Sequence, residues 1–133
     1  MWEPAIEITA LLGKTVSEIT GMEAGSEEII FCCIDGTNYR MHHDQDCCES
    51  VSIEDVCGDV GDLIGTPILQ AEESTNENET PEGVKPPENY DSYTWTFYKL
   101  ATYKGYVTLR WFGGSNDYSE SVDFHEIKPT TIQ

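Results

Sequence analysis

Two alternating segments near the C-terminal end of the chain restrict its fold most. Residues 92–103 alternate aromatic side chains with threonines, and residues 106–112 alternate apolar and polar side chains. A strand has a side-chain period of two, so both segments predict strands. Lys104-Gly105 lies between them and can form a turn. The two segments therefore predict an antiparallel hairpin in which aromatic side chains can pair across the strands.

A second hairpin is expected in the N-terminal half. A short apolar run over 28–34 stops at Asp35-Gly36 and resumes over 37–42, and strands flanking an Asp-Gly pair are typical of a hairpin. Weaker alternation indicates three further strands, at 14–20, 66–72 and 118–127. The glycines before Asp117 are expected to end the strand over 106–112. The segment 43–65 lacks strand character and predicts one short helix or an irregular loop.

The remaining long segment predicts a loop. Residues 73–91 are rich in Glu, Asn, Thr and Pro and cannot bury enough apolar area to offset the entropy of ordering them. We expect a single domain over 1–133 with a flexible acidic loop at 73–91. The fold class is mainly β, as a single antiparallel curled sheet or small open barrel with one short helix. An α+β fold is the alternative.

The net charge of the chain limits the kinds of partner that it can bind. The chain has 7 Lys and Arg against 25 Asp and Glu, giving a formal net charge of −18 at pH 7. Such a surface repels phosphate groups, which disfavours direct binding to nucleic acids and anionic membranes. Twelve carboxylates and no Lys or Arg lie between Met41 and Val84, and their field would steer a basic partner toward them. The predicted partner contacts are Asp44, Asp46, Glu49, Glu54, Asp55, Asp59 and Asp62.

Residues 39–59 also combine two histidines, three cysteines and six carboxylates, which are the side chains that bind Zn²⁺. The candidate ligands are His43, Cys47, Cys48 and Cys57. Their spacing matches no established zinc pattern, so the alternative is that the cysteines are buried apolar groups and the carboxylates a solvated face. A calcium loop over 55–62 has weaker support, because the EF-hand order of ligands is absent. A cysteine nucleophile beside a histidine also has weaker support, because the neighbouring carboxylates oppose thiolate formation.

The sequence also predicts where the protein acts. No run of 18 apolar residues is present, and the N-terminus lacks the features of a secretory signal. Five cysteines, four of them in vicinal pairs, do not suggest a disulfide framework. We therefore expect a cytoplasmic protein with reduced thiols.

The string from His43 to Val51, His-Asp-Gln-Asp-Cys-Cys-Glu-Ser-Val, resembles a family of small uncharacterised proteins of bacteria and their phages. The resemblance extends over about residues 11–127 and includes 94–98 and 119–122. It implies a phage or bacterial origin, with the cytoplasm of a bacterial host as the location, and implies no activity. It also favours 43–59 as the functional surface.

Two hypotheses follow. The first is a non-enzymatic acidic binding protein, such as a phage-encoded inhibitor or accessory factor that docks on a basic surface of a host protein, for example a nucleic-acid-binding protein. The alternative is a small metal- or ligand-binding protein, or a hydrolase, that uses the His, Cys and carboxylate cluster at 43–59. No phosphate loop, dinucleotide fingerprint or nucleophile elbow supports a common enzyme class.

Overall fold

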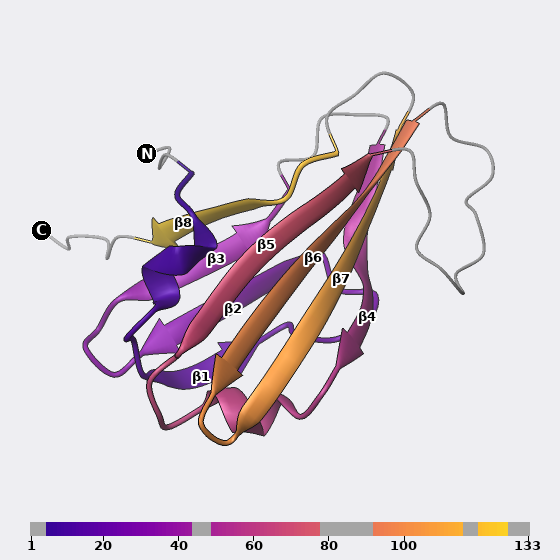
Figure 1. Cartoon of the computed structure of the whole chain (residues 1–133). Helices are drawn as coiled ribbons and strands as arrows, with labels where there is room; N and C mark the ends of the chain where they lie inside the picture. The colour runs from indigo at the N-terminus through magenta and orange to yellow at the C-terminus, as the bar shows by residue number, and fades with distance from the viewer. Residues whose placement is uncertain (1–4, 44–48, 78–91, 116–119, 128–133) are drawn as a thin grey trace, which may run out of the picture.

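Alternating side chains organise most of the chain into strands. In a computed structural model of the protein, residues 5–43, 49–77, 92–115 and 120–127 are described. Their strands form two four-stranded antiparallel sheets, stacked as two layers (Figure 1). Inward-facing residues of both layers make up one apolar core, as expected when each sheet buries one face against the other.

The first sheet has the strand order β1-β2-β3-β8. Its strands are β1 (Val16–Thr20), β2 (Glu28–Cys33), β3 (Asn38–His42) and β8 (Asp123–Ile127). β2 and β3 form the predicted hairpin, and at its turn the Thr37 N–H donates to the Asp35 carboxylate over 2.9 Å.

The second sheet has the order β4-β7-β6-β5. Its strands are β4 (Glu49–Cys57), β5 (Gln70–Glu77), β6 (Ser92–Thr102) and β7 (Gly105–Ser115). β6 and β7 are the predicted hairpin, in register along their full length. Val107, Leu109 and Trp111 of β7 face the core and are fully buried. On the opposite face Trp95 and Phe112 pair across the two strands, with ring centroids 4.8 Å apart.

Helical structure in the described residues is limited to two 3₁₀ turns, η1 (Ile8–Leu11) and η2 (Val60–Leu63). The Asp59 carboxylate caps η2 by accepting a hydrogen bond from Gly61 N–H over 2.9 Å. No helix of the described residues is long and apolar enough to cross a membrane.

The prediction of a mainly β, antiparallel fold is confirmed. The described strands form two sheets rather than one curled sheet, and they do not close into a barrel. The segment 43–65, expected to be a helix or loop, contains the nine-residue strand β4. Its alternation is visible in Val51 and Ile53, which are buried. A bulge between Ile53 and Asp55 then shifts the register, which obscures the period of two in the sequence.

Two strand ends also differ from the sequence predictions. β5 continues through residues 73–77, which were expected to be loop. These residues are polar because β5 is an outer strand, and its positions 72–76 are exposed. β7 continues through Gly113, where a Cβ would come within 2.9 Å of the Glu120 Cβ and carbonyl oxygen. Glycine is thus needed for close packing there, not for a break. The rest of the expected loop, 78–91, lies outside the described residues.

The outer strands of the sandwich differ in whether another segment is hydrogen-bonded to their free edge. On one side the loop after β1 covers β4: Gly25 N–H donates to the Ile53 carbonyl over 2.7 Å, and Ile53 N–H donates to the Ser26 carbonyl over 2.8 Å. On the other side Ile6 N–H donates to the Phe124 carbonyl of β8 over 2.7 Å. Within the described chain, the backbone of 72–76 on β5 bonds only to β6. Within the described chain, β5 therefore has an open edge over residues 72–76.

Candidate functional site

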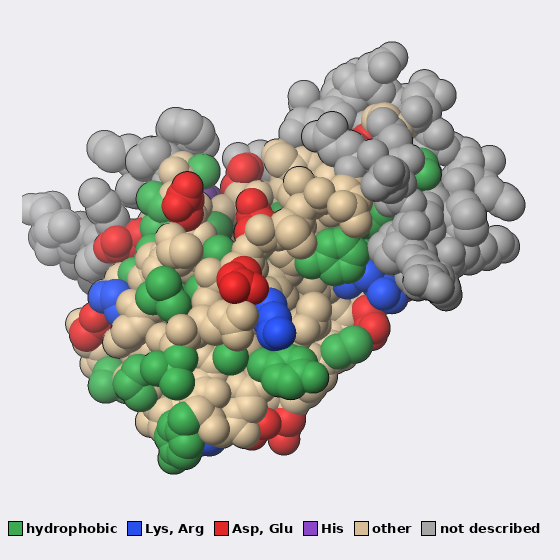
Figure 2. Space-filling view, viewed as in Figure 1, with side chains coloured by type: hydrophobic (Ala, Val, Ile, Leu, Met, Phe, Trp, Pro, Cys, Tyr) green, Lys and Arg blue, Asp and Glu red, His purple; other side chains and the backbone are tan. Residues whose placement is uncertain are grey.

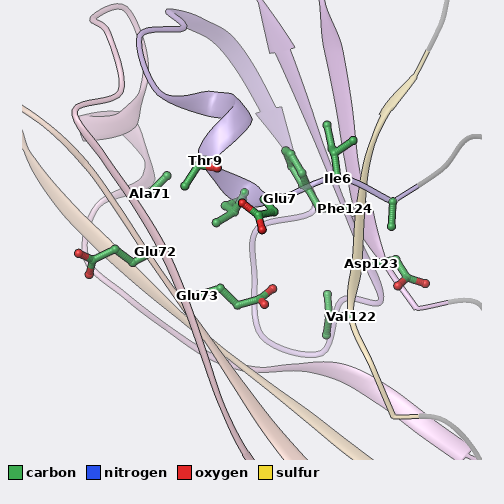
Figure 3. Close-up of a pocket in the computed structure, with 11 residues that line it drawn as sticks. Ile6, Glu7, Thr9, Ala71, Glu72, Glu73, Val122, Asp123 and Phe124 are labelled. Carbon is green, nitrogen blue, oxygen red and sulfur yellow. The ribbon is translucent and has the colours of Figure 1, made fainter.

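A cavity of about 490 Å³ lies on the open side of the sandwich, between β5 and β8 (Figure 3). We refer to it as the carboxylate cleft. The segment leading into η1 forms a third wall. The lining residues are Ala5, Ile6, Glu7, Ile8, Thr9, Ala71, Glu72, Glu73, Val122, Asp123 and Phe124. Four of them are carboxylates and none is basic, so the cleft is strongly anionic.

The carboxylates come from three separate parts of the chain. Glu7 precedes η1, Glu72 and Glu73 belong to β5, and Asp123 begins β8. Figure 3 shows Glu7 and Glu73 on facing walls of the cavity, whereas Glu72 extends to the other side of β5. Acidic side chains are also visible together on this face of the molecule in Figure 2.

The base of the cleft is apolar. Ile8 and Phe124 are 4% and 3% exposed, and the small Ala71 is 6% exposed. Phe124 also stacks on Tyr39, with ring centroids 5.2 Å apart. Glu7 is the residue before η1 and makes no side-chain capping bond. Its carboxylate therefore remains available to a ligand in the cleft.

Tyr98 of β6 lies beneath these carboxylates and is completely buried. Its hydroxyl has no hydrogen-bond partner of normal geometry among the described residues. Burial, followed by the Glu73 carboxylate and the charge of Asp123, raises the pKa of Tyr98 far above its usual value. The phenol therefore stays neutral in its buried position opposite Glu73.

A buried polar cluster adjoins the cleft, next to Val122. The His43 ring contacts two acceptors: Nδ1 lies 2.6 Å from the Ser121 carbonyl oxygen, and Nε2 lies 3.1 Å from the Glu49 carboxylate. The side chains of His43 and Glu49 are 3% and 0% exposed. Because a carbonyl can only accept, Nδ1 must carry a proton, and the contact between Nε2 and Glu49 then requires a second shared proton. The pair is a buried ion pair or its neutral tautomer.

Glu120 forms the other half of this polar cluster. Its carboxylate accepts hydrogen bonds from the hydroxyl of Ser92 over 2.5 Å and of Thr94 over 2.8 Å. Glu120 is only 8% exposed. Such satisfied buried groups rigidify a structure and specify one packing arrangement, so the cluster holds β8 and its approach against β4 and β6.

The structure separates the predicted metal ligands that it describes. His43 follows β3, whereas Cys57 ends β4 at the opposite end from Glu49. At about 3.3 Å per residue, a strand of this length holds Cys57 far from His43. Both His43 ring nitrogens are also engaged. Cys47 and Cys48 lie outside the described residues, and no metal-binding group of three or more His, Cys, Asp or Glu occurs within them.

The predicted partner contacts have different surroundings from one another. Glu49 is buried against His43 and is not presented to a partner. Glu54 and Asp55 both pair with Arg110, at 2.5 and 3.7 Å. Asp59 caps η2 and Asp62 lies within it, half-buried. Asp44 and Asp46 are outside the described residues.

A carboxylate also affects the thiol of Cys57, the exposed cysteine at the end of β4. A hydrogen bond to Asp55, together with the negative charge of that group, raises the pKa of the Cys57 thiol. This agrees with the expectation that acidic neighbours oppose thiolate formation. Cys57 is consequently a poor nucleophile in this environment.

None of the four carboxylates of the cleft was among the predicted partner contacts. Glu7 and Asp123 lie 116 positions apart, and no local motif connects them. Glu72 and Glu73 belong to the acidic stretch between Met41 and Val84, but they were assigned to a polar strand end and a loop. β5 and β8 are outer strands of different sheets, and these four residues come together only because both strands border the same cavity.

The buried pair leads to a stability prediction. His43→Ala would leave the Glu49 carboxylate buried without its imidazole partner, and we expect a loss of about 3 to 5 kcal/mol in the free energy of unfolding, measured with urea. Glu49→Gln on the same background should recover part of that loss, because it removes a buried charge that has lost its imidazole partner. If the double variant were less stable than His43→Ala alone, the ion-pair interpretation would be wrong.

Tyr98 leads to a prediction on pH. The folded pKa lies above the ordinary value of 10.0, so above pH 10 the unfolded chain loses a proton that the folded protein keeps. Stability should therefore fall there, with a slope of up to about 1.4 kcal/mol per pH unit from this group. Tyr98→Phe should remove that contribution and change stability little at pH 7. Urea unfolding between pH 8 and 11 measures the slope, with the exposed Tyr103→Phe as control; equal slopes in all three proteins would contradict the prediction.

Comparisons with known proteins place the chain in a family. No curated protein and no solved structure matches it. One family matches residues 9–124, which include every described strand except the last part of β8. The chain belongs to this family, which is described as a domain of unknown function, DUF7448.

Proposed function

We propose that this protein is a non-enzymatic acidic binding protein that docks on a basic surface of a host protein, and that the carboxylate cleft is the contact site. The observation that carries the proposal is the composition of the cleft. Four carboxylates and no basic residue line a cavity of about 490 Å³ with an apolar base. A lysine or arginine side chain fits such a site, because its stem can lie on apolar surface while its charged end meets the carboxylates.

The balance of charge elsewhere on the described chain supports this choice of site. Lys14 pairs with Asp35 over 2.7 Å, Arg40 with Glu28, and Arg110 with both Glu54 and Asp55. These basic residues neutralise carboxylates on other surfaces, and none of them lines the cleft. The cleft therefore keeps its negative charge, and a cationic group can enter it.

The net charge of −18 adds long-range attraction to this local complementarity. Such a field speeds association with a basic partner and weakens as salt rises, since the Debye length is about 8 Å at physiological ionic strength. A nucleic-acid-binding protein of a bacterial host presents a suitable surface, because carboxylates can occupy a groove that normally holds phosphates. A phage-encoded inhibitor or accessory factor acting in the host cytoplasm would have these properties.

The proposal predicts a salt-dependent and site-specific affinity for a cationic probe. Octalysine should bind the protein at low salt and bind at least about tenfold more weakly at 0.5 M NaCl, measured by isothermal titration calorimetry. The double substitution Glu7→Gln and Glu73→Gln should weaken binding at low salt by about tenfold, equivalent to about 1.4 kcal/mol.

The control for this experiment removes the same charge elsewhere. Glu18→Gln with Glu23→Gln changes two exposed carboxylates on and after β1, and it should weaken binding by less than about twofold. An equal loss in both double variants would show that only net charge matters and would refute the cleft as the site. Affinity that does not change with salt would refute the proposed function.

A further inference from the structure

We propose that the partner is bound as an extended basic segment that adds to the open edge of β5 as an additional strand, with every second side chain directed into the carboxylate cleft. This inference rests on the proposed function and specifies how the partner is recognised. The edge supplies backbone hydrogen bonds, and the cleft supplies the preference for cationic side chains.

The edge of β5 has the properties that strand addition requires. Residues 72–76 are all exposed, and in the described chain their backbone bonds only to β6. In an antiparallel outer strand, every second residue directs its N–H and C=O away from the neighbouring strand. Five consecutive exposed residues therefore provide a short row of available donors and acceptors.

The other outer strands are less accessible in the described structure. The edge of β4 is bonded at Ile53 to the loop residues Gly25 and Ser26, and β8 is bonded at Phe124 to Ile6. An isolated bridge between Thr15 and Pro67 joins the start of β1 to the chain before β5. β5 is therefore the outer strand with the longest open edge, and it is also the strand that forms a wall of the cleft.

The register of β5 determines where the side chains of an added strand would lie. Glu73 lies opposite the buried Tyr98, and Glu72 lies opposite the exposed Lys99. Consecutive residues of β5 thus alternate between the cleft and the outer face. A strand added about 4.8 Å away alternates in the same way, so its alternate side chains enter the cleft near Glu73 and Glu7.

Charge identifies the occupant as a basic segment rather than a second copy of this chain. Pairing of two β5 edges would place Glu72 and Glu73 close to their own counterparts, and like charges across strands are destabilising. Each copy also carries a net charge of −18, which opposes association. Lysine or arginine at alternate positions instead matches Glu7 and Glu73, which face each other across the cleft.

The test uses the full-length protein and three synthetic nonapeptides in which lysine and threonine alternate. One peptide is unmodified, the second is N-methylated on the amides of its lysines, and the third on the amides of its threonines. N-methylation removes an N–H donor and keeps the side chains and their charges. Strand addition uses the amides of only one of the two sets, so one methylated peptide should bind at least about tenfold more weakly than the unmodified peptide and the other within about threefold.

The outcomes separate this inference from the proposed function. Equal affinity of both methylated peptides, or an equal loss in both, would overturn strand addition. If octalysine bound in the cleft and the unmodified nonapeptide did not, strand addition would also fail, and the proposed function would stand. If neither bound, the proposed function itself would fail. Self-association of the protein that the nonapeptide reverses would identify a second copy as the natural occupant of the edge and would overturn the inference.

Discussion

Unpaired backbone groups at the sheet edges are the constraint on which this structure depends. Two four-stranded sheets that do not close into a barrel leave four outer strands, β1, β8, β4 and β5, and each exposes a row of donors and acceptors. The chain covers β4 with the loop that follows β1, and it attaches the N-terminal segment to β8. β5 instead carries exposed polar and acidic residues, which keep an open edge soluble. The cleft forms beside that strand because the sandwich is not closed there.

The distribution of the few basic residues gives the cleft its electrostatic character. Arg110 provides the clearest case: its guanidinium pairs with Glu54 and Asp55 and lies 5.7 Å from the centre of the Trp95 ring. Glu54 and Asp55 were predicted partner contacts, and Arg110 of the neighbouring strand β7 neutralises their charge. The carboxylates of the cleft come from other elements, and no basic residue is among those that line it. Net charge alone therefore does not locate a binding surface; the placement of the counter-charges does.

The sequence predicted local features better than those that depend on distant pairing. The β2–β3 and β6–β7 hairpins could be predicted because turn residues lie between segments with clear apolar or alternating patterns. β4 was missed because the bulge after Ile53 interrupts its alternation, and the end of β5 was missed because an outer strand needs no apolar residues. The cleft could not be predicted, since Glu7, Glu73 and Asp123 are brought together only by the arrangement of β5 and β8. His43 was predicted as a metal ligand from its position among cysteines and carboxylates, whereas its contacts with Ser121 and Glu49 depend on strands distant in the sequence.

The central claim is that β5 has an open sheet edge over residues 72–76, beside the anionic cleft. Residue-resolved hydrogen exchange of the free protein, followed by NMR, tests this most directly. The account predicts slow exchange at Ile53, whose N–H is bonded to Ser26, and alternating fast and slow exchange along 72–76. Protection of every amide along 72–76 would show that the edge is already occupied, and it would contradict the account.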